Sequence, residues 1–450
     1  MGEAAPEVEA ARGEPALGLG YLRRLLGYAN KVYGLGGVLQ RVRDGRLRPQ
    51  IPMATVVRAV FACGLFRVRS FNALEPQLGE PHLAHALGLG RVQRRGRVCS
   101  VDTLARTLRR AAPESFHEML SALIQRAERN KVFRAGWIGA LRYVALDGWE
   151  PIASRRRHCL QCLERQVSEG KQQVVEYYHR YVVALLLGPH EEVVLGFEPI
   201  RNRWARAQAG ERQVEGDEGE QPAAIRLLRR LRATYGRWLE VIVVDSLYPN
   251  GPFLTVLAEL GFAGVIVVKK ETDEPLRDAL TIWGTTPGQV VLDAEAQERL
   301  ELWDCPDCQT LATYAGPIRV VRGVVESMAA ARTPRRQWCL LVTGRVTHRL
   351  SARQLLRVAR ARWHLENTGF NQWTQHWRFE HVFTTDANAI VAIFALFFLA
   401  FNLLQLFVYR QLRSYGRLRG KDPTRTISRV VDILLADLHR LAAPVCWDSS

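Results

Sequence analysis

Lysine is scarce in this sequence: only six of the 62 basic residues are lysine, and the rest are arginine. Acidic residues are also few, 45 against those 62, so the formal net charge is +17. This imbalance favours a polyanion as the partner, nucleic acid first and an anionic membrane second. Arginine suits bidentate contacts with phosphate, although a GC-rich genome would enrich it as well.

A secretion signal is also lacking, because the first residues, MGEAAPEVEAARGEPA, are acidic and small. We therefore expect a cytoplasmic protein whose eight cysteines form no disulfides. Only one uncharged run, between Asp386 and Arg410, is long enough to cross a bilayer. Asn388, Asn402 and Gln405 interrupt this run, so we expect a buried core helix and no membrane partner.

The length of 450 residues allows two or three domains. Residues 1–18 are rich in Ala, Glu, Gly and Pro, which predicts disorder. Residues 19–135 carry apolar side chains at spacings of three and four, which predicts a helical domain. No helix-turn-helix signature accompanies it, so its basic side chains predict either DNA binding or a solvated helical surface. These side chains are Arg94, Arg95, Arg97, Arg106, Arg109 and Arg110.

Residues 140–270 change to short apolar runs in the order β-β-β-α-β-α-β, with a polar loop at 201–222. This order predicts an α/β fold with a mixed sheet. Residues 271–349 predict a β-rich insertion without a helix. One long helix over 353–381, the apolar helix 388–412 and a basic tail over 413–450 with a final helix complete the chain. The α/β domain would then comprise 140–270 and 350–412.

Two apolar runs each end in an acid followed by a turn: Asp147 in VALDG and Asp245 in IVVDS. A carboxylate at the end of a buried strand is costly unless a charge or a metal compensates it. Either residue alone would be read as a turn or cap aspartate. Together with Glu366, the one acid at the centre of helix 353–381, they predict a three-carboxylate site for Mg²⁺ or Mn²⁺.

The same helix offers residues that suit nucleic acid. Arg362 precedes Glu366 by four residues, so the two share a helix face and Arg362 can orient the carboxylate or hold a phosphate. Trp363, Trp373 and Trp377 could stack on unpaired bases or pack in the core. We expect Arg362, Trp373 and Trp377 to contact DNA, together with Arg155, Arg156 and Arg157 in the loop that follows Asp147.

The segments around Asp147, Asp245 and Glu366 make residues 140–410 resemble the DDE transposases of bacterial insertion sequences. The resemblance is to the branch of that family that has a Y-x2-R-x3-E-x6-K signature. The resemblance implies a ribonuclease-H-like catalytic domain with a β-rich insertion. It implies catalytic and metal-binding roles for Asp147, Asp245 and Glu366, and Mg²⁺-dependent cleavage and transfer of DNA strands at element ends. It also implies a DNA-bound homodimer and a bacterial, nucleoid-associated location.

Two positions depart from that signature, because Ala359 stands at the tyrosine and Trp373 at the lysine. These losses leave two alternatives open: a metal-dependent nuclease of the same fold, or an inactive transposase-derived DNA-binding protein. Glu380 is a rival third acid, but it lacks an arginine one turn earlier, so Glu366 is preferred.

Two C-x2-C pairs, Cys159 with Cys162 and Cys305 with Cys308, form a structural zinc pattern. One zinc shared by all four, reduced free thiols and separate roles are the three alternatives. His158 is a spare ligand.

Overall fold

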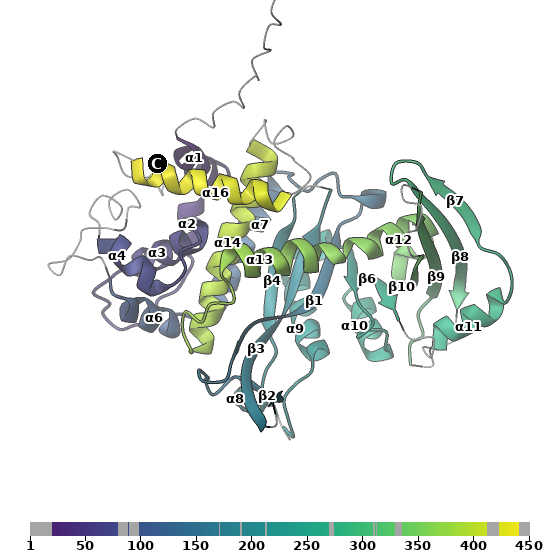
Figure 1. Ribbon diagram of the computed structural model, residues 1–450, viewed down its shortest axis with the longest axis horizontal. Coiled ribbons are helices and arrows are strands. Elements are labelled where there is room, and N and C mark those ends of the chain that lie inside the picture. Colours follow the sequence, from purple (N-terminus) through teal and green to yellow (C-terminus); the bar gives the residue numbers. More distant parts are fainter. Residues whose placement is uncertain are drawn as a thin grey trace, which may run out of the picture.

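The structure, a computed structural model, describes residues 20–79, 89, 99–170, 172–189, 191–211, 214–269, 274–308, 311, 313–328, 335–411 and 423–440 (Figure 1). The expected disordered segment 1–18 lies outside these residues, and so do Arg94, Arg95 and Arg97 of the predicted basic surface. The ends of the predicted tail, 413–422 and 441–450, also lie outside them.

A five-stranded mixed sheet forms the centre of the α/β region. Its strands are β1 (Tyr143–Ser154), β3 (Gln172–Leu187), β4 (Val193–Pro199), β5 (Val241–Val244) and β6 (Ala263–Val268). Strand β3 pairs antiparallel with both β1 and β4, and β5 lies parallel between β1 and β6. Helices α9 (Glu220–Tyr235) and α10 (Gly251–Glu259) provide the crossovers into β5 and β6. This arrangement confirms the predicted α/β fold and its ribonuclease-H-like sheet.

The sequence pattern explains which strands were predictable. Strands β5 and β6 read VIVV and AGVIVV, and every one of their residues is buried, as expected for parallel strands covered on both faces. Strand β2 (Leu163–Glu169) was not predicted, because its LERQVSE sequence is mostly exposed and lacks an apolar alternation. It pairs with the first half of β3 and lengthens that edge of the sheet.

Two expectations about the connections were wrong. The predicted loop 201–222 contains helix α8 (Arg203–Gln208), which starts where the Asn202 side chain accepts the Ala205 N–H. The predicted helix-free insertion contains α11 (Glu274–Trp283). Neither stretch has a long helical pattern. A side-chain cap is sufficient to start α8, and a short amphipathic turn is sufficient to form α11.

The insertion continues the central sheet. Its strands are β7 (Gln289–Asp293), β8 (Glu298–Cys308), β9 (Ile318–Ser327) and β10 (Arg336–Thr343). Strand β10 pairs antiparallel with β6, and β9, β8 and β7 follow outward. Within the described residues, the sheet therefore contains ten strands in the order β2-β3-β1-β5-β6-β10-β9-β8-β7, with β4 also on β3.

The N-terminal region is helical, as predicted. Its helices are α1 (Tyr21–Tyr33), α2 (Leu35–Leu39), α3 (Met53–Leu65), α4 (Phe71–Gly79), α6 (Val101–Arg110) and α7 (Pro113–Arg129). The helix of the tail, α16 (Pro423–Arg440), joins this group, since the Asp437 carboxylate accepts the N–H groups of Gly20 and Leu22 at the start of α1. Among the described residues, 3₁₀ turns cover Ile138–Ala140, Gly236–Trp238 and Gly344–Val346.

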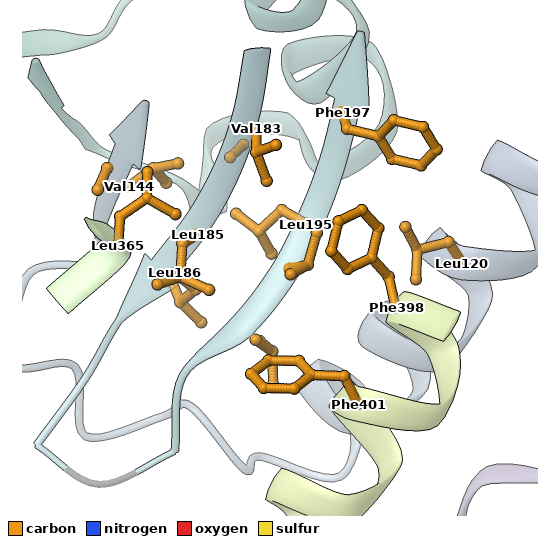
Figure 2. Packing of buried hydrophobic residues seen from close by; sticks show 14 of the residues in the cluster. Leu120, Val144, Val183, Leu185, Leu186, Leu195, Phe197, Leu365, Phe398 and Phe401 are labelled. Atoms are coloured by element: carbon orange, nitrogen blue, oxygen red, sulfur yellow. The ribbon is translucent and has the colours of Figure 1, made fainter. Parts of the chain in front are cut away.

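Helix α14 (Ala387–Gln411) lies between the helical group and the sheet (Figure 1). It is long and apolar enough for a membrane span, yet its most apolar stretch is entirely buried inside the protein. Phe398 and Phe401 of α14 lie against Leu195 and Phe197 of β4, with Leu120 of α7 beside them (Figure 2). The expected buried core helix is therefore present.

Candidate active site

Asp147 and Asp245 lie side by side on neighbouring parallel strands. Strands β1 and β5 pair in register, with Ala145 opposite Val243. Asp147 and Asp245 each lie two residues beyond that pair. Asp245 directly follows β5, as predicted, whereas β1 continues past Asp147 to Ser154, so the predicted strand end at Asp147 is wrong. Because side chains two residues apart point to the same face, both carboxylates project from the same side of the sheet edge.

Glu366 joins this pair through Arg362. The Arg362 Nη1 group donates to Asp147 Oδ2 at 2.5 Å, and its Nη2 group donates to Glu366 Oε1 at 2.5 Å. The Arg362 side chain is only 6% exposed, whereas Asp147 is 15% and Glu366 40% exposed. One buried guanidinium thus bridges the strand acid and the helix acid, as the i,i+4 spacing anticipated for Glu366.

The expected single helix over 353–381 is interrupted at this point. Helix α12 (Ala352–Ala361) ends just before Arg362, a π-helical segment covers Leu365–Phe370, and α13 (Asn371–Trp377) follows. Single π turns inside helices are frequent at functional sites. Figure 1 shows α12 and α13 crossing the strands of the sheet, so Glu366 is presented where the helical path is irregular.

The Asp147 carboxyl has a raised pKa of about 6. Burial is the main cause, and Arg362 opposes it by favouring the carboxylate. Asp245, Glu220 and Glu366 each add to the rise through their negative charges. Four acids therefore act on one another here with Arg362 between them, which is an arrangement that favours a further cation.

Glu220 is a member of this group that sequence reasoning missed. It is the first residue of α9 and is 7% exposed. Its two oxygens accept hydrogen bonds from the Tyr248 hydroxyl at 2.7 Å and from Arg180 Nη2 at 2.6 Å. An acid in the first turn of an amphipathic helix was the available signal, but many exposed acids share it.

Gly148 permits this packing next to Asp147. A Cβ atom at this position would lie 2.1 Å from Glu220 Oε2 and 2.7 Å from Arg180 Nη2. Any larger side chain would displace the Glu220–Arg180 pair, so the glycine after Asp147 has a steric cause.

A cavity of about 520 Å³ opens beside Arg362 and Glu366. Its wall combines apolar strand residues with Lys269, Arg336, Trp338 and Trp363. Trp363 is 46% exposed, and its ring lies edge-on to Trp338 with the centroids 6.3 Å apart. Both cationic and aromatic side chains therefore border Glu366.

The expected DNA contacts of Trp373 and Trp377 are wrong. Both side chains have no exposed surface. Trp373 packs against Trp149, Phe398 and Phe401, and Trp377 packs against Phe401. Large indole rings gain more free energy from burial against helix α14 than from solvent contact, so core packing is their role.

The two residues that depart from the family signature both lie in the hydrophobic core. Ala359 and Trp373 are both fully buried, so these positions face the core. Glu380, the rival third acid, is paired with Arg378 at 3.9 Å and is absent from the charges that act on Asp147.

Arg155, Arg156 and Arg157 are exposed in the turn after β1. Arg155 forms an ion pair with Glu169 of β2 at 2.7 Å. The turn leads directly into the first cysteine pair, so these arginines lie at the β2 edge of the sheet rather than among the acids.

A zinc shared by the two cysteine pairs is wrong. Cys159 and Cys162 precede β2 at one edge of the sheet, whereas Cys305 and Cys308 lie on β8 near the other. Seven strand spacings separate β2 from β8, on the order of 30 Å. His158 is also not the added ligand, because its ring stacks on Tyr177; His179 of β3 meets Cys159 and Cys162 instead.

Comparison with known families agrees with this geometry. Residues 212–403 match the family model described as the transposase DDE domain. The match spans Glu220, Asp245 and Glu366 and begins after Asp147. The curated proteins searched contain no match to the chain. The protein therefore carries a transposase DDE domain on a mixed α/β fold.

Proposed function

We propose that this protein cleaves DNA strands at the ends of an insertion element and joins them to target DNA. The observation that supports this proposal best is the convergence of Asp147, Asp245 and Glu366, in which Arg362 contacts two of the three acids. In the proposed site these three carboxylates hold divalent metal, Mg²⁺ or Mn²⁺, because hard cations prefer carboxylate oxygens.

A cation at these acids would take the place that Arg362 occupies in this structure, where its guanidinium contacts both Asp147 and Glu366. A buried guanidinium lies between Asp147 and Glu366, and burial, with the negative charges of Asp245, Glu220 and Glu366 as lesser causes, raises the pKa of Asp147. Both features mark a place where positive charge is favourable. When bound, the metal would supply activation of water or a 3′-hydroxyl and stabilisation of the leaving oxygen.

The chain's own side chains would then orient the DNA. Arg362 would be released from one carboxylate when the metal takes over its role, and its planar fork would become available to a phosphate. Glu220 remains buried and bonded to Arg180 and Tyr248, which positions it as a support for the strand end rather than a ligand. Trp363 is exposed at the cavity and suits stacking on an unpaired base.

The partner in this proposal is double-stranded DNA. The net charge of +17 and the exposed arginines at 155–157 and at Arg106 and Arg109 suit phosphate contacts. A DNA-bound homodimer and a cytoplasmic, nucleoid-associated location in a bacterium complete the proposal.

The test uses a plasmid in which a marker gene lies between the two DNA segments that flank this protein's coding sequence. These segments stand for the two ends of the element. With Mg²⁺ we expect cleavage at the segment ends and joined products. Glu366→Gln should lower both by about a thousandfold, or roughly 4 kcal/mol of transition-state stabilisation. Glu380→Gln is the matched control and should retain activity.

The other outcomes separate the alternatives. Cleavage without joining supports a nuclease of the same fold. Salt-dependent DNA binding without cleavage supports an inactive DNA-binding protein. Equal activity of wild type and Glu366→Gln overturns the assignment of Glu366.

A further inference from the structure

Three potential metal ligands converge at the start of β2, far from the acids. Cys159 and Cys162 come from the connection between β1 and β2, and His179 comes from β3. The two sulfurs are 3.7 Å apart, and each lies 3.4 Å from His179 Nε2. Cys162 and His179 are buried and Cys159 is partly exposed.

These separations match those of ligands around one tetrahedral ion. With Zn–S bonds of about 2.3 Å and Zn–N bonds of about 2.0 Å, two sulfurs should lie about 3.8 Å apart. A sulfur and a nitrogen should lie about 3.5 Å apart by the same geometry. All three observed distances agree with these values within about 0.2 Å, the tolerance expected for a real site.

The surrounding backbone holds the two thiols in place. The Cys159 N–H donates to Cys162 Sγ at 3.2 Å, and the Gln161 N–H donates to Cys159 Sγ at 3.3 Å. Asn202, which is 5% exposed, donates through Nδ2 to the carbonyls of Leu160 and Cys162. Donors to the sulfurs favour thiolates, and such outer contacts orient metal ligands.

We propose that Cys159, Cys162 and His179 bind a zinc ion that anchors the 155–162 connection to β3. Two thiolates and one imidazole are a zinc ligand set. The described residues supply three ligands, and a tetrahedral ion held by them would have one position left for a further ligand. The bound ion fixes the turn that carries Arg155, Arg156 and Arg157, since Cys159 follows Arg157 by two residues.

Cys305 and Cys308 provide the natural comparison. They have the same C-x2-C spacing, and the Cys308 thiol contacts Cys305 Sγ on β8. Among the described residues, no histidine, acid or further cysteine completes a cluster with them. The proposal therefore assigns zinc to one pair and not to the other.

Metal analysis of the full-length protein, purified without chelator and reloaded with Zn²⁺, tests this assignment. We expect about one zinc per chain in wild type and under about a tenth in Cys159→Ser with Cys162→Ser and in His179→Asn. Cys305→Ser with Cys308→Ser and His158→Asn are the matched controls and should retain the ion. Zinc-free wild type, or zinc lost only from the Cys305–Cys308 variant, overturns the proposal.

Cobalt substitution gives a readout that does not depend on the variants folding. Chelator-stripped wild type loaded with Co²⁺ should show thiolate-to-metal charge transfer and the intense visible bands of a tetrahedral ion. Trypsin should cut stripped protein after Arg155–Arg157 faster than reloaded protein, at least about threefold. Weak, octahedral-type cobalt bands or equal cutting rates argue against the site, and both readouts are independent of DNA activity.

Discussion

Arg362 Nη1 contacts Asp147 Oδ2 at 2.5 Å across 215 residues of sequence. The same side chain contacts Glu366, so a single arginine connects β1 to the π-helical segment Leu365–Phe370. Its burial raises the cost of losing either partner, because an unpaired charge would remain in a partly desolvated place.

Replacement of Arg362 by glutamine should separate structural from metal-binding effects. Without metal, the variant should lose about 3 kcal/mol of unfolding free energy, because it leaves two acids without their cation. It should bind Mn²⁺ more tightly than wild type, since a competing positive charge is gone. Urea unfolding and a Mn²⁺ titration measure the two effects. Arg378→Gln, which removes an outlying ion pair with Glu380, is the control; unchanged Mn²⁺ affinity in Arg362→Gln would contradict the prediction.

Tryptophans on the same helical segment should differ in role. Trp373→Ala should cost about 3–5 kcal/mol of stability, because it opens a cavity against helix α14. Trp363→Ala should leave stability within about 1 kcal/mol and weaken binding to DNA with an unpaired end by about tenfold, as expected for a lost base stack. Urea unfolding and fluorescence anisotropy check the pair. Wild-type affinity in Trp363→Ala would remove the proposed stacking role.

Asn402 should be essential for stability despite its place in an apolar helix. Its Oδ1 accepts the Val194 N–H at 2.7 Å, and its Nδ2 donates to the Val194 carbonyl at 2.8 Å. Asn402→Leu leaves both backbone groups of Val194 buried and unpaired, at a cost of about 2–5 kcal/mol. Thermal unfolding measures this loss. Asn388→Leu, at an exposed position of the same helix, should change little, and equal effects would refute the argument.

His117 should make stability depend on pH. Burial, and secondly the charge of Arg230, lower its pKa to about 3. Because the folded value lies below the unfolded value of about 6.5, this contribution is present near neutral pH and is lost as pH falls. The slope approaches about 1.4 kcal/mol per pH unit between these values. As pH falls from 7, the unfolding free energy of wild type should therefore decrease relative to that of His117→Phe, and urea unfolding at several pH values measures the difference; a constant difference would contradict the prediction.

The strand acids could be predicted because strand and site share one pattern. An apolar run followed by Asp147 or Asp245 indicates a buried strand, and the parallel pairing of β1 with β5 brings the two acids together. The continuation of β1 to Ser154 could not be predicted, because that part of the strand lacks an apolar run. The partners of Cys159 and Cys162 could not be predicted, because His179 lies in the middle of a strand whose own sequence gives no metal pattern. Only the pairing of β2 with β3 brings it to the cysteines.

The helix that carries Glu366 shows a second limit. Periodicity predicted one continuous helix, yet tertiary packing breaks it between Ala361 and Leu365. Trp373 and Trp377 were ambiguous for a related reason, since an indole suits both a base and a core, and only the position of α14 decides. Glu220 was missed because its burial follows from Tyr248 and Arg180, which are distant in sequence.

Helix α14 also limits which fragments of this protein can fold alone. Its buried surface is covered on one side by α3, α6 and α7 and on the other by β4. A fragment that begins at residue 136 would keep the acids but expose one side of a 25-residue apolar helix. Such a fragment would tend to aggregate or partition into lipid. The N-terminal helices therefore cover apolar surface that the α/β region would expose without them.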